Sequence, residues 1–132
     1  MKLLGVEKRD DYLYSEWNLT YRVGWHQIVK AAALIYQYTE DPEILTGDAE
    51  GMSKASVKSP EEIMNLEEMG YLTIRGISEI LKVPVMITFF NQLDLVRVTV
   101  ISETEEFAEA DYEKFNLSMC QYLDSAELAM YR

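Results

Sequence analysis

Two neighbouring apolar runs constrain the fold of this chain more than any other feature. Val85 to Phe90 is apolar at five of six positions, and valine recurs at every second position in Leu95 to Ile101. Runs of β-branched and aromatic residues separated only by Asn91 to Asp94 predict a β-hairpin. Because Val85 to Phe90 is apolar on both faces, we expect it to lie centrally in a sheet, with helices or another subunit covering each side.

The first third of the chain changes from a strand period to a helix period. Alternating residues from Tyr12 to Val23 predict a half-buried strand, and residues 2–7 are its expected hairpin partner across a charged turn at 8–11. After Gly24 the apolar residues fall at helical spacing, which predicts a helix that begins at Trp25. This helix should end near Asp41, because the following proline disfavours helical geometry in the residue before it.

The central part of the chain predicts a loop and two short helices. Residues 42–58 are rich in acids and contain two glycines, so we expect a long acidic loop there. Ser59 is a suitable N-cap for a helix, and Gly70 is a natural end for it. Residues 73–82 favour a second short helix, and a strand over 71–77 is the alternative.

The last predicted element is a long amphipathic helix in the C-terminal region. Apolar residues recur there at intervals of three and four from Ala108 to Met130. A length of 132 residues is close to the commonest size of one domain, so we expect residues 1–132 to form a single domain. The predicted fold class is α+β, with an antiparallel sheet of about four strands packed against three to four helices.

The charge of the chain disfavours nucleic acids and membranes as partners. Twelve basic residues against 23 acidic ones give a net charge of -11, which repels phosphate backbones and anionic membrane surfaces. A single cysteine cannot form an internal disulfide, which fits a reducing compartment. The early charges leave no room for a signal peptide, and no apolar run is long enough to cross a bilayer. We expect a cytoplasmic protein of the bacterial type.

The residues most often used in catalysis or metal binding have simpler explanations here. His26 falls on the polar side of its predicted helix, and Cys120 lies beside the apolar stripe of the last helix, where a thiol behaves as a small hydrophobic group. Glu105, Glu109 and Glu113 share one helical face and could hold Mg²⁺ or Ca²⁺, but acids near a helix N-terminus are stabilised by the helix dipole without any metal. The sequence therefore predicts no catalytic residue, no metal site and no cofactor.

One alternative comes from the order of the predicted elements. A helix, a second helix and a hairpin over residues 60–101 have the order of a winged helix-turn-helix. The basic residues in this part are only Arg75, Lys82 and Arg97, too few for the phosphate contacts that dominate DNA affinity. A winged-helix-like regulator, or an acidic protein that imitates DNA, is therefore the lesser alternative.

The supply of aromatic residues is the strongest functional signal. Nine tyrosines, two tryptophans and four phenylalanines are generous for a small domain, and Tyr12 and Tyr14 fall on the strand face opposite Trp17 and Tyr21. These four residues, with Arg97 on the predicted hairpin, are our candidate binding residues. We expect a non-enzymatic interaction protein that engages a protein partner or itself, as a homodimer, while its acidic surface selects a basic partner. A small enzyme or small-ligand-binding domain, with a pocket between sheet and helices, is the main alternative.

Overall fold

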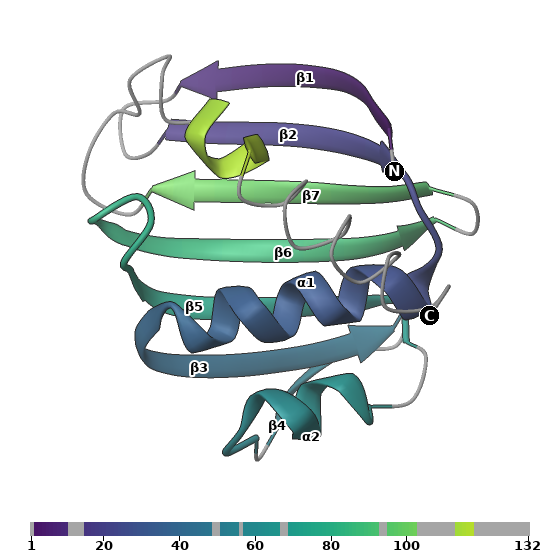
Figure 1. Ribbon diagram of the computed structural model, residues 1–132, viewed down its shortest axis with the longest axis vertical. Helices are drawn as coiled ribbons and strands as arrows, with labels where there is room; N and C mark the ends of the chain where they lie inside the picture. Colours follow the sequence, from purple (N-terminus) through teal and green to yellow (C-terminus); the bar gives the residue numbers. More distant parts are fainter. Residues whose placement is uncertain are drawn as a thin grey trace, which may run out of the picture.

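The fold is one antiparallel sheet with helices on one side of it (Figure 1). The computed structural model describes residues 2–10, 15–48, 51–55, 57–66, 69–92, 95–102 and 113–117. The strands are β1 (Lys2–Asp10), β2 (Ser15–Arg22), β3 (Thr39–Asp48), β4 (Gly51–Ala55), β5 (Tyr71–Ser78), β6 (Pro84–Gln92) and β7 (Leu95–Ser102). The helices are α1 (Trp25–Gln37), α2 (Pro60–Met64) and a short helical segment at residues 113–117.

The expected architecture of about four strands against three to four helices with a long C-terminal helix is wrong. The sheet has seven strands in the order β1-β2-β7-β6-β5-β3-β4, and the helices are short apart from α1. Of the helix expected from Ala108 to Met130, the described part is helical only at residues 113–117, and the remainder lies outside the described residues. Most of the sheet that we did not expect comes from the acidic segment after α1.

Residues 42–58 are mainly strand and not the predicted loop. β3 pairs with β5 on one side and with β4 on the other, so the acidic residues lie near the edge of the sheet, where polar side chains remain solvated. Pro42 is tolerated because it falls at a register shift between Glu40 and Glu43, where the ladder needs no N–H from it. Asp41, with a φ of 50°, makes the local bend.

Residues 71–78 form β5, so the predicted helix over residues 73–82 is wrong and the strand alternative is correct. The isoleucines and leucine of this segment fall at helical spacing, but β5 lies between β3 and β6 and is paired with both. Tertiary pairing therefore overrides a weak local preference. Gly76 also fits this position, because a Cβ there would overlap the side chain of Thr39 in the neighbouring strand.

Other predicted elements are confirmed with altered ends. β6 and β7 form the expected hairpin, and β6 is the central strand of the sheet. β1 pairs with β2, but residues 8–10 extend β1 and are not part of the turn. α1 begins at Trp25 as predicted and ends at Gln37, four residues early, because Thr39 already enters β3 and caps the helix by donating its hydroxyl to the Ile35 carbonyl at 2.6 Å. α2 begins as predicted, with the Ser59 hydroxyl accepting from the Glu62 amide.

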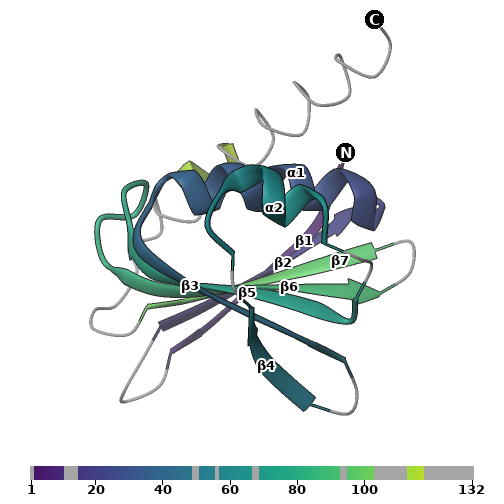
Figure 2. The same cartoon turned by 90° about the horizontal axis from the view of Figure 1, so that it is seen from below.

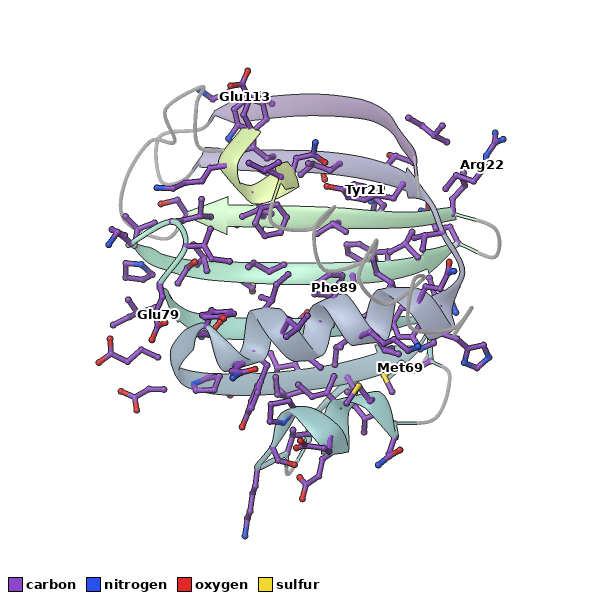
Figure 3. All side chains as sticks on the ribbon, viewed as in Figure 1. Tyr21, Arg22, Met69, Glu79, Phe89 and Glu113 are labelled. Carbon is purple, nitrogen blue, oxygen red and sulfur yellow. The ribbon has the colours of Figure 1, made fainter. Side chains whose placement is uncertain are left out.

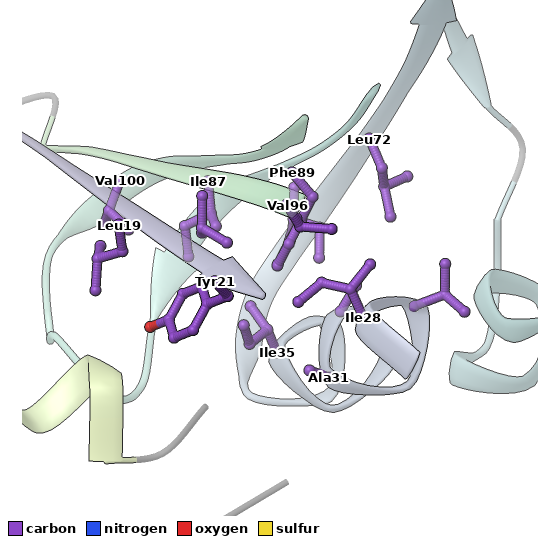
Figure 4. Close-up of a cluster of buried hydrophobic side chains, with 14 of the residues drawn as sticks. Leu19, Tyr21, Ile28, Ala31, Ile35, Leu72, Ile87, Phe89, Val96 and Val100 are labelled. Atoms are coloured by element: carbon purple, nitrogen blue, oxygen red, sulfur yellow. The ribbon is translucent and has the colours of Figure 1, made fainter. Parts of the chain in front are cut away.

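The core lies between α1 and one face of the sheet. Alternate residues of the strands point toward the helix, and those labelled in Figure 4 include Leu19, Ile87, Phe89 and Val96. The helix contributes its own apolar stripe from Ile28 to Ile35. Within the described residues the helices cover only this face (Figure 2), so of the expected cover on both sides of Val85 to Phe90, by helices or another subunit, the described helices provide one side.

The helical segment at residues 113–117 completes the covered face. Phe115 is buried in the core, and the Tyr21 hydroxyl donates to the Asn116 side-chain oxygen at 2.8 Å. Figure 1 shows this segment lying over β2 and β7, beside α1 on the side toward β1. On the opposite face the described residues form no helix, and β4 with the adjoining end of β3 lies below the central strands on that side (Figure 2).

Candidate functional site

The candidate site is a groove on the uncovered face of the sheet. It has a volume of about 610 Å³ and is lined by β1, β2, β7 and β6. This volume falls within the range of roughly 300–1,000 Å³ that is usual for ligand pockets. Because every second residue of a strand faces the same side, the lining residues come from alternate positions of each strand.

The strand register arranges these side chains in three rows that cross the four strands. The arginine row contains Gly5, Thr20, Arg97 and Phe90. The threonine row, two residues along each strand, contains Glu7, Asn18, Thr99 and Thr88. The methionine row, two residues further, contains Glu16, Ile101 and Met86.

The threonine row forms a polar floor whose hydrogen bonds run within the protein. The Thr99 hydroxyl donates to Asn18 Oδ1 at 2.7 Å, and Asn18 Nδ2 donates to Glu16 Oε2 at 3.0 Å. The Thr88 hydroxyl lies 2.9 Å from the hydroxyl of Thr73, which extends the row onto β5. Thr88 and Thr99 are only 8% and 7% exposed, although no described helix covers them. An occupant could cover Asn18, Thr88 and Thr99 without breaking these hydrogen bonds, which lowers the free-energy cost of covering this part of the floor.

In the arginine row a cation contacts an aromatic ring, and that ring contacts a second one on β5. The Arg97 guanidinium lies over the Phe90 ring, 4.5 Å from its centroid, and the Tyr71 ring contacts the Phe90 ring at 6.1 Å between centroids. Tyr71 in turn lies against Gly47 of β3, where a Cβ would overlap its ring. Arg97 Nε is buried and has no hydrogen-bond partner within the described part of the chain. The guanidinium therefore contacts an aromatic ring and has no acceptor at Nε within the described residues.

The methionine row offers apolar surface at the opposite side of the floor. Met86 and Ile101 are half-buried there, and Glu16 stands beside them on β2. Four residues along a strand separate this row from the arginine row, which is about 13 Å. The groove therefore has the Arg97 cation in the arginine row, and the carboxylates of Glu7 and Glu16 in the other two rows. Apolar surface lies on both sides of the polar floor.

The structure separates the candidate binding residues that the sequence suggested. Trp17 and Tyr21 lie on the helix-covered face, where both are buried, and the Lys8 ammonium stands over the Trp17 ring at 5.4 Å. Of the described candidates, Arg97 lines the groove. Tyr12 and Tyr14 lie outside the described residues.

Some of the residues for which the sequence predicts no catalytic or metal-binding role lie within the described ranges. His26 is exposed on α1, and Glu113 is exposed on its helical segment (Figure 3). Glu105, Glu109 and Cys120 lie outside the described residues. Among the residues that are described, no three of the types His, Cys, Asp and Glu are grouped so that they could hold a metal ion. No helix in the described ranges is both long enough and apolar enough to cross a membrane.

Sequence reasoning missed most of the groove. The sequence did not predict a binding role for Asn18, Thr88 and Thr99, because they are ordinary strand residues. The alternation in β7 did place Thr99 and Arg97 on the face opposite the valines. The pocket between sheet and helices, which belonged to the alternative of a small enzyme or ligand-binding domain, does not correspond to this groove, since buried apolar side chains lie under α1 (Figure 4). No protein-family model, curated protein or solved structure matches this chain.

Proposed function

We propose that the protein is a non-enzymatic binding module that holds a polypeptide segment of a partner protein in the groove of the uncovered face. The observation that carries this proposal is the combination of a floor with internal hydrogen bonds and apolar surface at both sides of it. Such a surface gains free energy from apolar contacts while its buried polar groups keep their partners. The groove residues include no histidine or cysteine, and the charged side chains among them are Glu7, Glu16 and Arg97, so thiol chemistry has no nucleophile there.

The spacing of the apolar surface suits an extended chain. Phe90 and the pair Met86 and Ile101 lie about 13 Å apart, which is the rise of four residues in an extended strand. Side chains four residues apart in such a segment point to the same side, so both would face the sheet. A polypeptide could therefore place one side chain on each apolar area with its backbone above the threonine row.

Charge supports a protein partner over a nucleic acid. The net charge of -11 repels phosphate backbones and attracts partners of basic overall charge, mainly by accelerating their encounter. Within the groove itself the charged residues are two acids, Glu7 and Glu16, and one base, Arg97. The same proposal places the protein in a reducing cytoplasm, which its single cysteine supports.

A peptide selection tests this proposal. A displayed library of random 12-residue peptides is selected on the wild-type protein, and recovered peptides are titrated into ¹⁵N-labelled protein. We expect micromolar binding that moves the amide signals of Thr88, Phe90 and Thr99. The blocking variant is Gly5→Trp, because a side chain at this exposed groove position meets no atom within 4 Å. The matched control is Gly24→Trp, which adds the same side chain in open space before α1.

The outcomes separate the groove from other surfaces. Loss of binding in Gly5→Trp with retention in Gly24→Trp supports the proposal. No enriched peptide, equal binding to both variants, or signal changes confined to α1 would overturn it. The homodimer suggested by the sequence remains a competing proposal, which sedimentation tests. A mass of twice 15.3 kDa for the wild type, reduced to one chain in Gly5→Trp, would assign the groove to a second copy and refute the partner segment.

A further inference from the structure

We infer that Arg97 is a carboxylate receptor in the groove, so that the bound segment carries an acidic side chain or its own C-terminal carboxylate next to an apolar residue. This inference rests on the proposed function and names the chemistry that the groove selects. Its basis is the position of one guanidinium among the lining residues, the way in which that guanidinium is held, and the acceptor that it lacks.

The guanidinium is positioned before any ligand arrives. It lies over Phe90, with 4.5 Å between Arg97 Cζ and the ring centroid, and the Phe90 ring in turn contacts the tilted ring of Tyr71 on β5. The Tyr71 ring packs directly against Gly47 of β3, so it has no room to move toward that strand. A planar cation that is already oriented loses little freedom when it binds an anion, so more of the interaction appears as affinity.

The surroundings of Arg97 favour an anionic acceptor over water. Its Nε is shielded from solvent and, among the described residues, has no hydrogen-bond partner. A cation that has lost part of its hydration without gaining a protein acceptor interacts more strongly with an incoming negative charge. The two terminal nitrogens are the donors that remain for the groove, and their fork matches the two oxygens of a carboxylate.

The rest of the groove selects a single negative charge flanked by apolar groups. Glu7 and Glu16 lie in the same groove and repel a second negative charge, which disfavours phosphate relative to carboxylate. The Phe90 ring beside the guanidinium offers apolar contact to the neighbouring part of the ligand. A carboxylate attached to an apolar or aromatic group meets both requirements.

A matched pair of small probes tests Arg97 independently of any peptide. 3-Phenylpropionate and its neutral amide, 3-phenylpropanamide, have the same shape and differ in charge. Each is titrated into ¹⁵N-labelled protein while the Arg97 Nε–H signal and the Phe90 and Thr99 amide signals are followed. We expect the carboxylate to move these signals and to bind roughly 10-fold or more tightly than the amide, as for a charge-assisted hydrogen bond.

Variants separate the local contact from the general charge. Arg97→Gln should reduce the affinity for 3-phenylpropionate to that for the amide, and Arg97→Lys should restore only part of it because lysine lacks the planar fork. The control is Arg22→Gln, which removes the same charge from an exposed position at the end of β2 that does not line the groove (Figure 3). This control should leave the preference for the carboxylate over the amide unchanged.

The results distinguish failure of this inference from failure of the proposed function. Equal affinity of the two probes for the wild type, or an equal loss in Arg97→Gln and Arg22→Gln, would overturn the role of Arg97. If selected peptides still bind the groove in that case, the proposed function stands without it. If 3-phenylpropionate binds at Arg97 but no peptide is selected, the carboxylate receptor is supported and the polypeptide partner is refuted.

Discussion

Two adjacent phenylalanines in the central strand test whether the helices cover only one face of the sheet. Phe89 points toward α1 and is 0% exposed, whereas Phe90 points into the groove and is half-buried. Replacing Phe89 by alanine leaves a cavity in the core, for which we expect a loss of about 3–5 kcal/mol in the free energy of unfolding. Phe90→Ala loses mainly the Arg97 contact and the Tyr71 ring pair, about 1–2 kcal/mol together.

Urea denaturation followed by circular dichroism measures this difference. With a slope of about 2 kcal/mol per molar urea, the midpoint should fall by roughly 1.5–2.5 M for Phe89→Ala and by roughly 0.5–1 M for Phe90→Ala. If Phe89→Ala fails to fold, Ile87→Val on the same buried face provides a milder change of about 0.5–1.5 kcal/mol. Equal midpoints for the two phenylalanine variants would show that the groove face is covered as fully as the core face, and the groove would not exist.

Three further substitutions test separate parts of the structure, each by urea denaturation. Gly47→Ala should cost about 1–3 kcal/mol because its Cβ would overlap the Tyr71 ring, and a neutral result would mean that Tyr71 does not lie against this glycine. Tyr21→Phe should lower the free energy of unfolding by about 1 kcal/mol because it removes the hydrogen bond to Asn116. An unchanged free energy would mean that this bond does not hold the helical segment at residues 113–117 on β2. His26→Ala should change stability by less than about 0.5 kcal/mol, and a larger loss would contradict its exposed position on α1.

The predictable part of the fold is the part encoded by strong local patterns. The β6–β7 hairpin was predicted from the apolar run of β6 and the alternation of β7, and the start of α1 from a period of 3.6 residues. β3 and β4 were missed because acids, Pro42 and two glycines give this segment the composition of a loop. Only its pairing with β5 makes it a strand, and pairing between distant segments leaves no local signature.

The site was predictable only in fragments for a related reason. Alternation in β7 places Arg97 and Thr99 on one face and three valines on the other, so the sequence did indicate two distinct surfaces. It could not indicate that β2 and β7 would be neighbours, and this pairing is what brings Asn18 beside Thr99. It also could not indicate which face the helices would cover, so the aromatic pattern predicts Trp17 and Tyr21 as binding residues although both are buried.

The pairing of β2 with β7 also affects how the chain folds during synthesis. The paired residues, from Arg22 with Leu95 to Ser15 with Ser102, are roughly 80 positions apart in the sequence, and contacts of this range slow folding because a long loop must close first. At translation rates of about 5–20 residues per second, β2 waits roughly 4–16 seconds for its neighbour to be synthesised. Throughout that interval the hydrogen-bonding edge of β2 that later pairs with β7 remains open. The nascent chain is therefore most prone to aggregate before residue 102 has left the ribosome, and a chaperone that shields the β1–β2 hairpin would be most effective in that interval.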